Sequence, residues 1–103
     1  MTASLLDTLL SVGNPRVLVI GDLILDRYVW GETNRISPEA PIPILTMRQE
    51  ESRPGGAGNV VNALAHLKAR PTCCGVVGDD ADGRLLTGML RQMCDGRLRI
   101  WTD

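Results

Sequence analysis

Two aspartates and a glycine-rich turn are the residues of this sequence best suited to bind a small ligand. Asp22 and Asp26 follow the first apolar run, and Gly55, Gly56 and Asn59 stand where the stretch RPGGAGNVVNAL enters a predicted helix. A carboxylate can accept two hydroxyl hydrogen bonds, and such charge-assisted bonds are about twice as strong as neutral ones. Glycine costs ~1 kcal/mol in a helix relative to alanine, so clustered glycines indicate a sharp turn or close approach of a ligand. A polyhydroxylated ligand such as a sugar fits both groups of residues.

Two familiar phosphate-binding loops do not fit the glycine cluster. A Rossmann fingerprint needs a third small residue where Val61 stands, and it needs a buried strand where the sequence has EESRP. The Gly-Lys-Ser/Thr ending of a P-loop is absent from the sequence. From the residues alone, a turn that merely shapes the chain remains the alternative to a ligand site, and Asp22 is as well suited to cap the following turn as to bind a ligand. Arg35 and Arg53 are candidates to meet a phosphate, although loop arginines are more often solvated.

Hydrophobic periodicity predicts alternating helices and strands around these residues. The predicted elements are a helix capped by Ser4 and stopped by Gly13 and Pro15, a strand Arg16–Gly21 buried on both faces, a helix with Val60, Leu64 and Leu67 on one face, a strand Thr72–Gly78, a helix capped by Asp82, and a strand 97–102. Segments at about 27–31 and 41–50 are predicted edge or flap strands, since the first is a short aromatic run and the second contains Pro41 and Pro43, which exclude it from the middle of a sheet. The pattern favours an α/β fold with a parallel sheet, flanking helices and a small β lid, with at most three core strands and an exposed edge.

Composition limits the possible partners. The chain has 103 residues, with 11 basic and 12 acidic side chains that nearly cancel. This balance indicates neither a nucleic-acid surface nor a membrane patch. The first 13 residues are apolar but lack a basic start and are too short to span a bilayer, so we do not interpret them as a targeting segment. Three cysteines, two of them adjacent, fit no disulfide framework and predict a reducing, cytoplasmic location.

The remaining reactive side chains have simpler explanations than catalysis or metal binding. His66 is expected on a helix surface, far from a second metal ligand. Cys73 and Cys74 lie in an apolar strand and are expected to be packing residues. The acidic cluster Asp79, Asp80 and Asp82 is better explained by helix capping than by a metal. No metal ligand is therefore predicted in this chain.

Three stretches together carry a family resemblance. GDLILDRYVWGETNRISPEAPIPIL, RPGGAGNVVNAL and GVVGDDADGRLL resemble the ribokinase-like (PfkB) carbohydrate kinases. Within that family they are most similar to the heptose-7-phosphate kinase domain of ADP-heptose and lipopolysaccharide synthesis, with RISPEAP the most specific mark. The resemblance runs from about Val17 to Leu90. The sequence departs from the family pattern at Val61, where a small residue is usual, and at Lys68, where glycine is usual.

The resemblance implies roles for individual residues. Asp26 would hold sugar hydroxyls, Gly55 and Gly56 would lie against the sugar, and Asn59 would hydrogen-bond it. The two flap segments would form a lid that closes over the sugar and pairs with a second subunit in a homodimer. Closure would exclude water and so prevent wasteful hydrolysis of ATP.

The family's catalytic turn, Gly-Ala-Gly-Asp, does not occur in this sequence. In the family its aspartate acts as general base and its amides stabilise the transferring phosphate. GAGN at residues 56–59 is no substitute, because an amide cannot act as a base. Residues 1–103 are therefore expected to be the N-terminal part of a kinase domain that uses ATP and Mg²⁺ when complete, with the catalytic aspartate beyond residue 103. Alone the chain is expected to be inactive and poorly soluble, or ordered only as a dimer. A non-catalytic fragment or sugar-binding module is the alternative, and a Rossmann domain is disfavoured.

Overall fold

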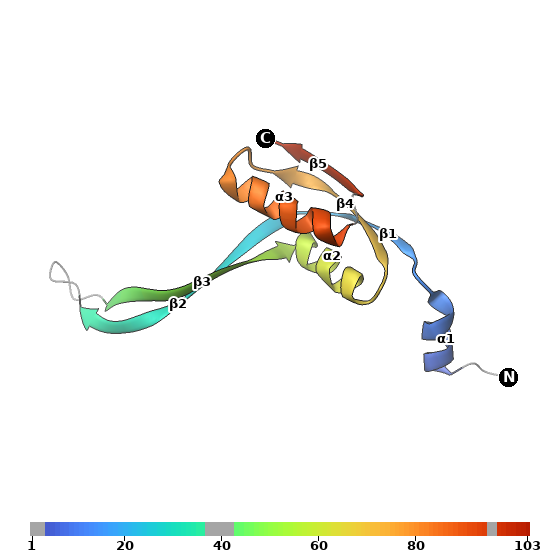
Figure 1. Cartoon of the computed structure of the whole chain (residues 1–103), viewed down its shortest axis with the longest axis horizontal. Helices are drawn as coiled ribbons and strands as arrows, with labels where there is room; N and C mark the ends of the chain where they lie inside the picture. Colours follow the sequence, from blue (N-terminus) through green and yellow to red (C-terminus); the bar gives the residue numbers. More distant parts are fainter. Residues whose placement is uncertain (1–3, 37–42, 95–96) are drawn as a thin grey trace.

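The chain alternates helices and strands in the predicted order (Figure 1). The computed structural model describes residues 4–36, 43–94 and 97–103. The elements are α1 (Leu5–Val12), β1 (Arg16–Ile20), β2 (Leu23–Ile36), β3 (Pro43–Gly56), α2 (Ala57–His66), β4 (Arg70–Val77), α3 (Ala81–Met93) and β5 (Leu98–Thr102). The order α-β-(β-β)-α-β-α-β confirms the sequence prediction. No helix in these ranges is long and apolar enough to span a bilayer.

Three of the strands form a parallel sheet in the order β1-β4-β5. Val19 of β1 pairs with Cys73 of β4, which in turn pairs with Leu98 of β5. Helix α2 lies in the connection from β1 to β4, and helix α3 connects β4 to β5. Each connection places the next parallel strand on the same side of the previous one, so β4 is the central strand. The predicted α/β class with a parallel sheet and flanking helices is confirmed.

Both crossover helices pack on one face of this sheet. Alternate strand residues point to that face, where they meet the apolar sides of the helices. The buried core consists of Val19, Cys73, Val77, Val61, Leu86, Leu90 and Cys94. These residues come from two strands, both helices and the residue after α3, so the core ties the elements that follow the glycine cluster to β1.

The opposite face of the sheet is uncovered in the described part of the chain. Leu18 and Ile20 are 61% and 69% exposed, and Val76 and Trp101 are 56% and 58% exposed. The prediction that Arg16–Gly21 is buried on both faces was therefore wrong for this chain. Its apolar run is what a strand covered on both sides requires, yet the described elements cover only one.

Helix α2 also turns a different side inward than its periodicity predicted. Val61 is fully buried, whereas Val60 and Leu67 are 51% and 74% exposed. Only Leu64 of the predicted stripe packs against the core. The predicted stripe was wrong because two apolar faces lie side by side on this helix, and the packing of α3 against it selects one of them.

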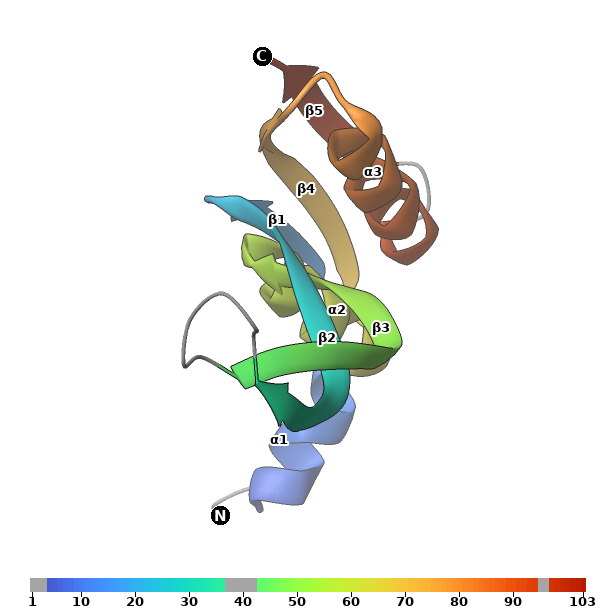
Figure 2. The ribbon, with the colours of Figure 1, turned by 90° about the vertical axis from the view of Figure 1, so that its left-hand side faces the viewer.

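The predicted lid segments are parts of a long β ribbon. Strands β2 and β3 pair antiparallel from Leu23 with Gly56 to Ile36 with Pro43, and the ribbon projects from the sheet on the side away from α1 (Figures 1 and 2). The predicted segments 27–31 and 41–50 were therefore too short, although residues 41 and 42 and much of RISPEAP lie outside the described residues. The sequence underestimated the ribbon because strand pairing continues through polar residues that show no hydrophobic alternation.

Helix ends follow local capping chemistry. Ser4 accepts a hydrogen bond from the amide of Asp7 at 3.1 Å, and Gly13 with φ 69° ends α1, as predicted. Helix α3 is capped by Asp80, which accepts from the amide of Gly83 at 2.8 Å. The prediction of Asp82 as this cap was wrong: Asp82 lies in the first turn of α3, where its charge complements the helix dipole.

Candidate sugar site

Asp22 and the predicted glycine turn meet where the ribbon joins the sheet. Gly21 and Asp22 follow the carboxyl end of β1, and Gly56 ends β3 at the start of α2. The amide of Ala57 donates a hydrogen bond to the carbonyl of Asp22 at 2.8 Å. Ile24 pairs with Gly55 in the ribbon register. The two motifs, about 30 residues apart in sequence, thus form one structural unit at the carboxyl edge of the sheet, where ligand crevices of open α/β sheets lie.

Asp26 lies directly over Gly55. A Cβ atom built at Gly55 would overlap the Asp26 carboxylate, so a side chain at position 55 would displace it. Gly55 is buried and Asp26 is half-buried. Glycine at position 55 is therefore required for the carboxylate to lie close to the backbone of the glycine turn.

Gly56 provides the turn into α2. Its φ of 56° is in a region that side chains rarely adopt, and a Cβ there would come within 2.5 Å of the Asp22 carbonyl oxygen. Because Gly56 is the N-cap and has no side chain, no side-chain cap hydrogen bond occupies the first amides of α2. Asn59, the third residue of α2, is exposed beside this helix end. The Asn59 side chain is therefore open to a polar ligand, whereas the Ala57 amide is already paired with the Asp22 carbonyl.

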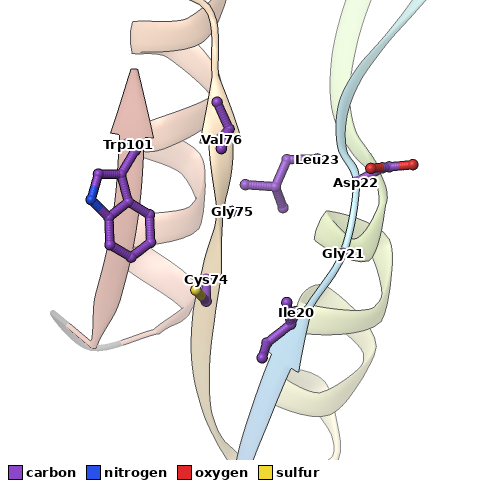
Figure 3. A pocket seen from close by; sticks show the side chains of 8 residues that line it. All are labelled: Ile20, Gly21, Asp22, Leu23, Cys74, Gly75, Val76 and Trp101. Carbon is purple, nitrogen blue, oxygen red and sulfur yellow. The ribbon is translucent and has the colours of Figure 1, made fainter. Parts of the chain in front are cut away.

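Asp22 lines two open hollows next to this turn. One, of about 610 Å³, lies on the uncovered face of the sheet with Leu23, Cys74, Gly75 and Trp101 among its walls. In Figure 3, Leu23 points toward Gly75, whereas the Asp22 carboxylate points away from Trp101. The other hollow, of about 670 Å³, is bounded by β1, Gly56 and the outer side of α2. Neither hollow is lined by Asp26 or Asn59, and both are largely apolar, so neither brings together the residues predicted to bind hydroxyl groups.

Arg53 lies on the same ribbon face as Asp26, its register partner. Its guanidinium forms a two-pronged ion pair with Glu51, at 2.8 and 2.9 Å, and lies 4.9 Å from the centre of the Tyr28 ring. The hydrogen bond from Arg53 lowers the pKa of the Glu51 carboxyl. A phosphate would have to compete with Glu51 for this cation. The side chain of Arg35 lies outside the described residues.

Sequence reasoning missed Gly75, and it noted the departure at Lys68 without its conformational reason. The side chain of Leu23 packs over Gly75, where a Cβ would come within 2.7 Å of Leu23 Cδ1. An isolated glycine inside a strand is a known sign of such close approach. Lys68 has φ 68°, a left-handed conformation that glycine adopts readily. This explains why glycine is usual at this position in the family that the sequence resembles.

The remaining reactive candidates behave as packing or surface residues. Cys73 is fully buried, and burial, followed by the neighbouring Cys94 and Cys74, raises its pKa to about 11. Its thiol is therefore neutral near pH 7. His66 is exposed at the end of α2, where Nδ1 lies 2.8 Å from the carbonyl oxygen of Asn62. Across residues 4–36, 43–94 and 97–103, no three acidic, histidine or cysteine side chains are grouped as a metal site would require.

Comparison with known proteins identifies the family to which the chain belongs. The family model of the pfkB family carbohydrate kinases matches residues 14–93. The chain therefore belongs to this family. A putative ribokinase structure from Agrobacterium tumefaciens shares the fold, with a TM-score of 0.55 and 20% identity over 87% of this chain and 28% of that one.

Particular relatives are more similar in sequence. The bifunctional protein HldE of Helicobacter pylori strain G27 is 50% identical over 88 residues, which are 85% of this chain and 19% of that protein. HldE of Pelobacter propionicus is 59% identical over 69 residues, 67% of this chain and 14% of that protein. The chain thus spans less than a fifth of the length of these curated relatives.

Proposed function

We propose that this chain forms the sugar-binding part of an ATP-dependent kinase that converts heptose 7-phosphate to heptose 1,7-bisphosphate. The observation that carries the proposal is the Asp26 carboxylate lying over the buried Gly55, beside the uncapped start of α2. A carboxylate and an exposed amide side chain, Asn59, next to a glycine turn suit a ligand with many hydroxyl groups. Membership of the carbohydrate kinase family and the HldE relatives support the choice of a heptose phosphate.

Each site residue has a proposed task. Asp26 accepts hydrogen bonds from sugar hydroxyls, Gly55 lets that carboxylate lie close to the turn, Gly56 shapes the turn into α2, and Asn59 donates and accepts through its amide. Asp22 lies at the edge of the same site. Arg53, released from Glu51, is the described cation on the Asp26 face that a substrate phosphate could recruit. Arg35 is proposed for the same task from the sequence alone.

ATP and Mg²⁺ would supply the phosphoryl group and balance its charge in the complete enzyme. The residues described here offer no grouped metal ligands, and the sequence has no Gly-Ala-Gly-Asp turn. No step of phosphoryl transfer is therefore assigned to this chain. Its residues bind and orient the sugar, and the β2–β3 ribbon acts as a lid that we propose pairs with a second copy.

The direct test is to titrate the isotope-labelled chain with heptose 7-phosphate and follow its amide resonances. Saturable shifts at Asp26, Gly55 and Asn59 are expected, with none in the same titration with glycerol 3-phosphate, which lacks the sugar ring. Shifts of equal size with both compounds would contradict a sugar site. ADP release from ATP and heptose 7-phosphate, measured with sedimentation of the same sample, is expected to stay at background. Turnover by a monomer would place the catalytic base within this chain and support Asp79 or Asp80.

A further inference from the structure

The β2–β3 ribbon has two faces with different neighbours. Successive residues of a strand point to opposite sides, so Asp26 and Arg27 lie on opposite faces. Asp26 faces Gly55 in the candidate sugar site. Arg27 faces α3, the helix whose Leu86 and Leu90 are anchored in the core.

The Arg27 guanidinium joins three elements. Its Nε donates to Glu50 Oε1 of β3 at 2.9 Å, and its Nη2 donates to Asp82 Oδ1 of α3 at 2.5 Å. Arg27 and Asp82 are 55 residues apart in sequence. The other ribbon ion pairs of the described residues, Arg48–Glu32 and Arg53–Glu51, are internal to the ribbon. The Arg27–Asp82 pair is therefore the described side-chain hydrogen bond that ties the ribbon to the core.

The Arg27–Asp82 pair lies next to the candidate sugar site. Arg27 is the residue directly after Asp26, and beyond it Tyr28, Val29 and Trp30 are 42–44% exposed. Release of Arg27 from α3 would therefore free the backbone directly beside the Asp26 carboxylate. An exposed ion pair contributes little to global stability, but it can restrain local opening of the chain.

We propose that Arg27 is a positioning residue: its pairing with Asp82 and Glu50 holds the ribbon against α3 and thereby holds the Asp26 carboxylate over Gly55. The part of this inference that concerns sugar affinity rests on the proposed function. The part that concerns ribbon movement rests on the contacts alone.

The test compares Arg27→Gln with Arg48→Gln. Arg27→Gln removes two exposed ion pairs, to Glu50 within the ribbon and to Asp82 of α3, whereas Arg48→Gln removes one pair within the ribbon. Only the first variant therefore breaks the link to α3. Amide hydrogen exchange at residues 25–28 is expected to accelerate about two- to five-fold in Arg27→Gln and to stay unchanged in Arg48→Gln. Asp82→Asn is expected to match Arg27→Gln, and the double variant is expected to be no faster than either single one. Arg27→Lys should recover part of the protection, and ~1 M salt should remove the difference from the parent chain.

Affinity for heptose 7-phosphate is expected to fall by a similar factor in Arg27→Gln and to stay unchanged in Arg48→Gln. Equal exchange rates in these two variants would overturn the proposed link. Faster exchange with unchanged sugar affinity would overturn the positioning role. If the parent chain binds no sugar phosphate, the proposed function fails, while the exchange comparison still decides whether Arg27 holds the ribbon.

Discussion

The two ends of the β2–β3 ribbon differ in what determines their conformation. At the root, Leu23 and Leu25 pack against the core, Gly55 is buried beneath Asp26, and a side chain at Gly56 would meet the Asp22 carbonyl. In the arm, the Tyr28 and Trp30 rings stack on each other with centroids 6.1 Å apart and remain partly exposed. The root is thus fixed by contacts with the rest of the chain, whereas the arm is ordered by contacts within the ribbon. A binding site requires residues held in place by the core, as at the root. A lid that closes requires a segment that keeps its own structure while it moves relative to the core, as in the arm.

The largest effect is expected from a side chain at the root turn. Gly56→Val should lower the free energy of unfolding by about 2–5 kcal/mol, because it combines backbone strain with overlap at the Asp22 carbonyl. Urea unfolding followed by circular dichroism measures the loss. Gly13→Val is a matched control, since Gly13 has nearly the same backbone angles, φ 69° and ψ −132° against 56° and −130°, but nothing within 4 Å of its Cβ position. Equal losses in both variants would mean that the root packing adds nothing.

Removing the charge of Asp26 should separate binding from folding. Asp26→Asn is expected to weaken binding of heptose 7-phosphate by about 1.5–3 kcal/mol, the contribution of hydrogen bonds to a charged group, with unfolding unchanged. Isothermal titration calorimetry measures the difference. Asp7→Asn, which removes an acid from α1, should leave affinity unaltered. Normal affinity in Asp26→Asn with an intact fold would refute the sugar-site assignment.

A substitution after the C-terminal end of α2 is expected to have a smaller effect, which is a gain in the free energy of unfolding. Lys68 occupies a left-handed conformation with φ 68°, which costs a non-glycine residue about 1–2 kcal/mol. Lys68→Gly should therefore raise the free energy of unfolding by roughly 1 kcal/mol, part of the relief being offset by the greater freedom of glycine in the unfolded chain. Thermal unfolding measures this gain in stability. Ala69→Gly should instead be destabilising, and a loss of stability in Lys68→Gly would show that its side chain has an unrecognised contact.

The smallest effect is expected in the arm. Trp30→Ala should change the free energy of unfolding by less than ~0.5 kcal/mol, because the ring contacts other arm residues and not the core. The fluorescence of Trp101, the second tryptophan of the chain, reports unfolding of the sheet in this variant. Leu23→Ala at the root serves as the contrast, with an expected loss of about 2 kcal/mol. A larger loss for Trp30→Ala than for Leu23→Ala would reverse the comparison of root and arm.

Much of the fold could be predicted because its signals are local. The helix start at Ser4, the stop at Gly13 and the order of all eight elements follow from capping residues and periodicity. The wrong predictions concern burial and capping, which depend on the residues and elements packed nearby. Val60 and Val61 are equally apolar, and only the packing of α3 selects Val61 for the core. Asp80 and Asp82 are equally good caps, and the turn geometry selects Asp80.

The candidate site divides in the same way. The sequence by itself determined that Asp22 and Asp26 follow a strand and that Gly55, Gly56 and Asn59 precede or enter a helix, because backbone preferences of these residue types are local. Only the tertiary structure decided that Asp26 lies over Gly55, since that contact depends on the pairing register of two strands. The pairing of Arg27 with Asp82 was likewise decided by the fold, because α3 lies in the second crossover, between β4 and β5, and reaches the ribbon only through the packing of the sheet. Contacts between residues distant in the chain depend on how the elements pack, and no short stretch of sequence encodes that packing.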